Sequence, residues 1–224
     1  MISVILPTLW RLEFEEQLVK LHESSIVGEI LLINNDRRNT PAWFNPEKFI
    51  KLTEIIPYTN IFVNPAWNLG VRSANYEHIM LQSDDVVSSN YDFLEEIDCE
   101  LTNDDCLIGV DRSCYDVMLS LNKSNDKIQF NDISNSSRDL GFGCMMFFRK
   151  NSYKPISNEY LIWRGDDFMI DRYKHMNKKV KTIINLPLAG TRMSVTVDSP
   201  EFNWKVDVEG SPSKYNRCLA EYLK

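Results

Sequence analysis

Two pairs of neighbouring aspartates are the residues of this sequence best suited to chemistry. Asp84 and Asp85 follow the run 78–82, which we predict to be a buried strand, after the single residue Ser83. Open α/β sheets bind their ligands at the carboxyl ends of their strands, where Mg²⁺ or Mn²⁺ can join two carboxylates to the oxygens of a diphosphate. Capping of the following turn is the alternative, and the pair alone does not decide between the two.

Asp166 and Asp167 form the second pair, directly after Gly165 and at the predicted start of a helix. A carboxylate at that position stabilises a helix by about 0.5–2 kcal/mol, because it meets free N–H groups and the positive end of the macrodipole. One carboxylate is enough for a cap. The other could act as a general base toward an acceptor hydroxyl, so both roles stay open.

Further polar groups are expected at the same edge of the sheet. Arg11 follows the first predicted strand and Arg72 opens the helix after the third, where a guanidinium suits phosphate oxygens. Asn34, Asn35 and Asp36 follow the second strand and could contact a nucleobase or ribose. Turn formation explains these three residues equally well.

Strands and helices alternate in the first half of the chain. Short runs rich in Ile, Val and Leu alternate with segments of helical spacing, which indicates βαβ units and a mainly parallel sheet. The predicted strands are 2–6, 29–33, 61–63, 78–82, 106–110, 117–121, 144–148, 180–184 and 193–197. The predicted helices are 12–25, 46–55, one from 71 and one from 165. The polar stretch 122–139 is expected to be a mobile loop.

Length and composition predict one soluble domain. The chain has 224 residues and 43% hydrophobic content, which suffices for one buried core. No apolar run approaches the roughly 18–20 residues of a membrane-spanning helix. Residues 1–6 look like a first strand and not a signal peptide, because no basic segment precedes them and no cleavage site follows.

The cysteine spacing and the net charge indicate the cellular setting and the kinds of ligand to expect. The five cysteines show no C-x-x-C spacing, so we expect a reducing, cytoplasmic setting without a disulfide framework or zinc site. The net charge of −7 argues against broad binding to phosphate backbones. A local basic patch is expected to be a solvated surface; it comprises Arg172, Lys174, Lys178, Lys179 and Lys181.

The order of these pieces resembles family 2 of the GT-A glycosyltransferases, from residue 2 to about residue 176. The segments that carry the resemblance are ISVILPT (2–8), LLINND (31–36), NLG with Arg72 (68–72), SDDV (83–86), the glycine-rich start of strand 141–149, and WRGDD (163–167). The resemblance implies a Rossmann-like α/β fold with a mainly parallel central sheet and helices on both faces. It also implies one domain over residues 1–224, with a nucleotide-sugar-binding half (1–110) and an acceptor-binding half (111–224).

The resemblance also implies roles for individual residues. Pro7 and Thr8 at the end of strand one would bind the donor nucleoside, together with Asn35 and Asp36; Arg11 would also contact the donor. Asn68, Gly70 and Arg72 would approach the donor diphosphate.

The D-x-D signature of the family falls on residues 83–85, so Asp85 would bind the metal and Asp84 would lie beside the ribose or sugar. Ser83 stands where the family has its first Asp, and residues 186–197 contain no counterpart of the metal-binding His of many members. Asp167, with Asp166 as the second choice, would be the catalytic base.

The implied activity is metal-dependent, inverting transfer of a sugar from a nucleoside diphosphate sugar to an acceptor hydroxyl, with Mn²⁺ or Mg²⁺. The acceptor would be a surface glycan, or a modified base in phage DNA. A nucleotidyltransferase is one alternative, although residues 7–11 lack the glycine-rich basic loop expected of it. A catalytically silent module that binds sugar nucleotides is the other, because of Ser83 and the missing His.

Overall fold

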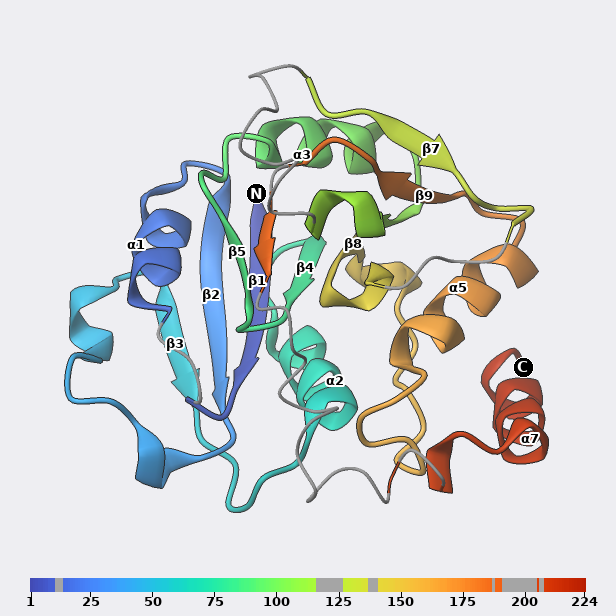
Figure 1. The fold of residues 1–224 in the computed structure, drawn as a ribbon, viewed down its shortest axis with the longest axis horizontal. Helices are drawn as coiled ribbons and strands as arrows, with labels where there is room; N and C mark the ends of the chain where they lie inside the picture. The colour runs from blue at the N-terminus through green and yellow to red at the C-terminus, as the bar shows by residue number, and fades with distance from the viewer. Residues whose placement is uncertain (11–13, 116–126, 137–140, 187, 191–204, 206–207) are drawn as a thin grey trace.

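The computed structural model describes residues 1–10, 14–115, 127–136, 141–186, 188–190, 205 and 208–224, and all structural statements refer to these. Within them, eight strands form one sheet in the order β3-β2-β1-β4-β8-β6-β9-β7 (Figure 1). The strands are β1 (Ile2–Thr8), β2 (Val27–Asn34), β3 (Leu52–Ile55), β4 (His78–Gln82), β6 (Leu107–Val110), β7 (Phe130–Asp132), β8 (Met145–Arg149) and β9 (Val180–Ile183).

The sheet is mainly parallel, as predicted. β1 pairs in parallel with β2 and β4, β2 with β3, and β6 with β9. β8 runs antiparallel to β4 and β6, and β7 antiparallel to β9. Two further strands, β5 (Val86–Ser88) and β10 (Leu188–Gly190), form a small antiparallel sheet that joins the chain after β4 to a late segment.

Helices cover both faces of the sheet, because strand residues alternate between two cores. In β1, Val4 and Leu6 belong to one core, while Ile5 belongs to the other. The first core includes residues of α1 (Glu15–Glu23) and α3 (Leu94–Asn103). The second includes residues of α2 (Val63–Ser73), α5 (Gly165–His175) and α7 (Pro212–Tyr222), the last two toward the β7 end of the sheet (Figure 1).

The sequence prediction is wrong between residues 46 and 73. The expected helix 46–55 is a short 3₁₀ turn (Pro46–Lys48) followed by strand β3, and the expected strand 61–63 leads into α2. The sequence did not predict β3, because it is a four-residue edge strand that contains the charged Glu54 and no buried residue. The sequence predicted α2 only from residue 71, because Pro65 and Gly70 precede that position. Pro65 lies in the first turn of α2, where a missing N–H is tolerated.

Other predicted elements agree with the structure where it describes them. The runs 2–6, 29–33, 78–82, 106–110, 144–148 and 180–184 coincide with strands of the main sheet. The stretch 122–139, expected to be a loop, contains strand β7. The predicted strands 117–121 and 193–197 lie outside the described residues. No helix in the described part of the chain has the length and apolar character that would let it cross a membrane.

Gly70 lets α2 lie close to β1, and its replacement tests the packing. A Cβ at this position would meet Ile5 Cγ2 at 2.4 Å. Overpacking of a core destabilises the folded state by about 1–3 kcal/mol. The higher helix propensity of Ala relative to Gly stabilises it by only about 1 kcal/mol. We therefore expect Gly70→Ala to lower the free energy of unfolding in urea denaturation. Ser73→Ala, at an exposed position of the same helix, is the control and should not lower it.

Candidate active site

The ends of β1 and β4 are joined by a hydrogen bond between side chains. Thr8 Oγ1, at the last position of β1, donates to Asp84 Oδ2 over 2.7 Å. The backbone of Thr8 is held in turn by the next strand, because Asn35 N donates to Thr8 O over 2.9 Å. Polar groups from three strands thus meet at the carboxyl edge of the sheet, as the βαβ pattern predicts.

A tight turn after β4 presents Asp84 and Asp85. Val86 N donates to Ser83 O at 3.3 Å, and Ser83 N donates to Cys144 O at 2.9 Å, which ties the turn to the segment before β8. The buried Gln82 braces the same turn, since its Nε2 donates to Val86 O over 2.7 Å. The backbone that carries the two carboxylates is therefore fixed from both sides.

The two aspartates are half-buried and repel each other. Burial, with the neighbouring Asp85 charge as a smaller contribution, raises the pKa of Asp84 to about 6, although the Thr8 hydroxyl works in the opposite direction. Burial raises the pKa of Asp85 as well. A raised carboxyl pKa means that the folded state holds the proton more tightly than the unfolded state. On account of Asp84, the free energy of unfolding therefore falls as the pH rises from about 4 to 6.

This pair of carboxylates fits a divalent cation. In the described part of the chain, no ion pair joins Asp84 or Asp85 to a lysine or arginine. Two partly desolvated carboxylates without a counter-charge are unfavourable, and carboxylate oxygens are the ligands that Mg²⁺ and Mn²⁺ prefer. The donor set and its electrostatics are consistent with the metal site predicted at Asp85.

An open pocket of about 410 Å³ lies beside this edge, after β2 and β3. It includes the predicted donor-binding residues Asn35 and Asp36. The other residues that line it are Arg37, Arg38, Ile56, Pro57, Tyr58, Thr59 and Asn60. Asn35 Oδ1 accepts a hydrogen bond from Ile61 N, and this bond links the two segments that form the pocket. The sequence prediction missed residues 56–60, which a strand placed at 52–55 would have put at the carboxyl edge.

Asp166 and Asp167 lie in the first turn of α5, and their side chains have different surroundings. Asp167 Oδ2 forms an ion pair with Arg164 Nη1 at 3.0 Å. Asp166 lies against the glycine-rich turn before β8, since a Cβ on Gly143 would come within 2.9 Å of Asp166 Oδ2. The next residue after Gly143 is Cys144, whose carbonyl holds Ser83. Of the two aspartates, Asp166 therefore packs against the segment that is bonded to the Asp84 turn.

The structure does not bring Asn68, Gly70 and Arg72 to this edge. The prediction of a helix that begins only at residue 71 is wrong, because α2 begins at Val63 and contains all three residues. Asn68 holds the chain before α5 through bonds to the backbone N and O of Ile156, and Gly70 packs on β1.

Arg72 lies exposed in the last turn of α2, which leads into the start of β4 and so to the opposite edge of the sheet. The predicted donor contact Arg11 lies outside the described residues. Pro7, also predicted to bind the donor, is the residue of β1 directly before Thr8 and is half-buried.

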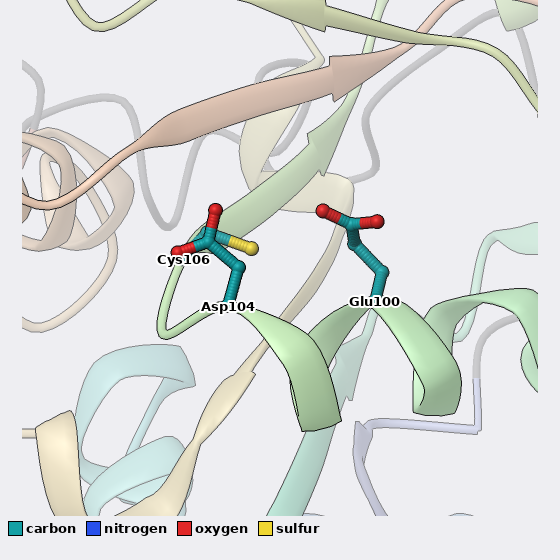
Figure 2. Close-up of side chains that lie close together, drawn as sticks. All are labelled: Glu100, Asp104 and Cys106. Atoms are coloured by element: carbon teal, nitrogen blue, oxygen red, sulfur yellow. The ribbon is translucent and has the colours of Figure 1, made fainter.

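A second acidic cluster, remote in sequence from the two aspartate pairs, forms ion pairs with lysines of the protein itself. Figure 2 shows Glu100 and Asp104 from the end of α3 together with Cys106, and their ligand atoms lie within 4.8 Å of one another. Lys181 Nζ forms ion pairs with both carboxylates, and Lys179 Nζ forms one with Asp104 at 2.7 Å. Burial raises the pKa of the Cys106 thiol to about 12. The cluster is therefore an ion-pair network between α3 and β9.

The predicted basic patch is accounted for by the same kind of contact. Lys178 forms an ion pair with Asp105, and Lys179 and Lys181 pair with the cluster just described. Arg172 and Lys174 donate to the backbone carbonyls of Ser152 and Ser136. Lys179 is exposed, as expected of a solvated surface, whereas Lys178 and Lys181 are half-buried, and acidic residues near the end of α3 pair with all three lysines.

Solved structures with the same arrangement of elements include glycosyltransferases. Residues 1–349 of TarS from S. aureus match with a TM-score of 0.63 and 16% identity, covering 99% of this chain and 70% of that one. The same TarS fragment in complex with UDP gives a TM-score of 0.60 and 15% identity over the same shares. The mannosyltransferase PcManGT from Pyrobaculum calidifontis, in complex with GDP-Man and Mn²⁺, gives 0.62 and 14%, covering 92% of this chain and 59% of that one.

No protein-family model and no curated protein sequence matches the chain. At identities of 14–16%, the structural likeness establishes the fold. The chain therefore has a GT-A-like fold, as the order of its motifs predicts.

The carboxylate pair predicts a metal response that depends on pH. We expect Mn²⁺ with UDP to raise the melting temperature, since a ligand at 100 times its Kd stabilises a protein by about 2.7 kcal/mol. A metal must displace the proton of Asp84, whose pKa is raised to about 6, so the response should be larger near pH 7.5 than near pH 5. Scanning fluorimetry measures both effects.

Asp85→Ala should remove the part of the response that requires the metal. Arg72→Ala is the matched control, because Arg72 lies at the opposite edge of the sheet, and it should keep the full response. A full metal response in Asp85→Ala would contradict the placement of the metal at this turn.

Proposed function

We propose that this protein is a glycosyltransferase that moves a sugar from a nucleoside diphosphate sugar to an acceptor hydroxyl. The observation that carries the proposal is the Thr8–Asp84 bond on a GT-A-like fold, which fixes a pair of carboxylates next to an open pocket. The similar structures support the class of donor, since one contains UDP and another GDP-Man with Mn²⁺.

On this proposal the donor nucleoside occupies the pocket between residues 35–38 and 56–60. The amide and carboxylate of Asn35 and Asp36 offer hydrogen bonds to base or ribose, and Tyr58 is a fully exposed aromatic ring on which a base can stack. Asp84 is linked to the pocket through Thr8, which donates to one of its oxygens and whose carbonyl accepts from Asn35 N. Residues 1–110 would thus bind the donor, and residues 111–224 the acceptor.

Asp85, with Asp84 beside it, would hold the divalent metal. A bound Mn²⁺ or Mg²⁺ supplies positive charge that stabilises a departing diphosphate. Asp85 is the better ligand of the two, because no hydrogen bond to another side chain occupies its carboxylate among the described residues.

Asp166 is the proposed base. Its carboxylate takes the proton of the acceptor hydroxyl while the hydroxyl oxygen attacks the anomeric carbon, and the bond from that carbon to the diphosphate oxygen breaks with inversion. The sequence favoured Asp167. The surroundings favour Asp166 instead, because Asp166 packs against the Gly143 turn, and the next residue of that turn, Cys144, is bonded to the turn that carries Asp84 and Asp85.

The acceptor is proposed to be a glycan hydroxyl and not a base in DNA. Binding to a duplex requires positive side chains that are free to meet phosphates. In the predicted basic patch, Lys178, Lys179 and Lys181 are ion-paired within the protein. This leaves less positive charge for DNA than the sequence alone suggested.

The activity itself is tested by incubating the protein with UDP-sugars and GDP-sugars in the presence of Mn²⁺. We expect release of the nucleoside diphosphate from at least one donor, through transfer or slow hydrolysis. Binding of a nucleoside diphosphate without any release would contradict the proposal and leave the silent sugar-nucleotide-binding module.

Replacing the proposed base should separate catalysis from binding. Asp166→Asn keeps the size of the side chain and an acceptor for Asp167 N, so we expect unchanged affinity for UDP. Loss of a general base lowers the rate by about 10²–10⁴-fold. Asp167→Asn loses an ion pair with a partly exposed arginine and should lower kcat much less. If both variants transfer sugar at the parental rate, the base lies elsewhere.

The pocket predicts a role for Tyr58 in donor binding. Because the ring is fully exposed, its removal should not affect folding. We expect Tyr58→Ala to weaken nucleoside diphosphate binding by about 1–3 kcal/mol, the usual contribution of stacking between a base and an aromatic ring. Isothermal titration decides this, with Tyr58→Phe as the variant that retains binding. Ile50→Ala, at an exposed position outside the pocket, should also bind normally.

A further inference from the structure

The segment directly before α5 has an unusual set of hydrogen-bond partners. Three consecutive backbone N–H groups, of Leu161, Ile162 and Trp163, donate to the carboxylate of Glu209 over 3.0, 3.1 and 2.8 Å. Glu209 is 2% exposed and comes from the segment that precedes α7. One buried carboxylate thus fixes three successive residues of a segment that is neither helix nor strand.

The carbonyl groups of the same segment are held from the opposite direction by Asn64. Its Nδ2 donates to Tyr160 O at 3.2 Å and to Trp163 O at 3.1 Å, and its backbone N donates to Leu161 O at 2.9 Å. Asn64 is completely buried in the first turn of α2. Segment 160–163 is therefore clamped between the start of α2 and the chain before α7.

The clamp determines where α5 begins. Arg164 follows the clamped residues with a left-handed backbone (φ 66°), which L-amino acids other than glycine seldom adopt. At Gly165, a Cβ would meet Asn64 Oδ1 at 2.2 Å, so the first turn of α5 lies directly against Asn64. The next residue is Asp166. A shift of segment 160–163 would therefore move the proposed base.

A carboxylate is well suited to this task. Hydrogen bonds from backbone N–H groups to an ionised acceptor are shorter and about twice as strong as neutral ones. Lys205 lies near Glu209, and the negative charge of that carboxylate opposes the lowering of the Lys205 pKa by burial. Glu209 therefore combines a fixed position with a charge that its surroundings support.

We infer that Glu209 is a positioning residue for sugar transfer: it sets the location of Asp166 by binding the three N–H groups before α5. The inference rests on the proposed function, because it assumes that Asp166 removes the acceptor proton. Misplacement of a catalytic group by about 1 Å can cost on the order of 100-fold in rate. The effect of Glu209 should therefore appear in kcat more than in affinity for the donor.

The test is Glu209→Gln, which keeps the shape of the side chain but removes the charge and one acceptor oxygen. We expect kcat to fall roughly 10- to 100-fold, with the Kd for UDP and Mn²⁺ within about twofold of the parent. Hydrogen exchange of the peptide that covers 160–168 should become faster. Glu209→Asp restores the charge on a shorter side chain and should recover part of kcat.

Glu159→Gln is the matched control. Glu159 forms an exposed ion pair with Arg217 of α7, so it belongs to the same packing interface without bonding the backbone of segment 160–163. We expect its kcat and exchange to equal those of the parent.

An unchanged kcat in Glu209→Gln, with faster exchange at 160–168, would overturn the inference, because Glu209 would then only stabilise the segment. If Glu209→Gln does not fold, Glu209→Asp decides: a lowered kcat at unchanged UDP affinity supports the inference, and a parental kcat overturns it. A parent protein that releases no nucleoside diphosphate from any donor would overturn the proposed function, and the inference with it. The activity of the parent protein therefore distinguishes a failure of the inference about Glu209 from a failure of the proposed function.

Discussion

Two negative charges held next to each other and partly out of water are the constraint on which the rest of this site depends. Such a pair is unfavourable by itself, and the Thr8 hydroxyl offsets only part of the cost at Asp84. The fold keeps the pair in place through groups that have no charge of their own, namely the Gln82 amide and the Cys144 carbonyl. A site built in this way favours a cation from solution, because the neighbouring described chain supplies none.

The groups around that pair come from segments far apart in the sequence, and close backbone contact brings them together. At Gly143 and Gly165, a neighbouring side chain occupies the space that a Cβ would fill: Asp166 in the first case and Asn64 in the second. These contacts join the turn before β8, the start of α5 and the start of α2. Electrostatics at β4 and tight packing at α5 are thus parts of one arrangement at one edge of the sheet.

The sequence was a good guide where the signal is local. Apolar runs located the central strands, and the Asp84–Asp85 and Asp166–Asp167 pairs stood out because two carboxylates directly follow an apolar run or open a helix. It was a poor guide where position depends on distant contacts. Strand β3 is a short edge strand without an apolar run, so the following pocket was missed and α2 was placed eight residues late. The misplacement put Arg72 at the wrong edge of the sheet.

The partners of segment 160–163 could not have been found from the sequence. Asn64 precedes it by about a hundred residues and Glu209 follows it by almost fifty, and no motif marks either one. A buried glutamate that binds backbone N–H groups looks like any surface glutamate in a sequence. Only the tertiary structure shows that its carboxylate accepts hydrogen bonds from three backbone N–H groups.

The small sheet of β5 and β10 has a consequence for how the protein is made. β5 begins directly after the Asp84–Asp85 turn, and its Ser88 pairs with Leu188, about a hundred residues later in the chain. Contacts of such long range are slow to form, because the intervening loop must first be closed. During synthesis on the ribosome, the turn therefore acquires its second strand only after most of the chain has emerged. An incomplete nascent chain would therefore lack the strand pairing next to the Asp84–Asp85 turn until residues 188–190 have emerged.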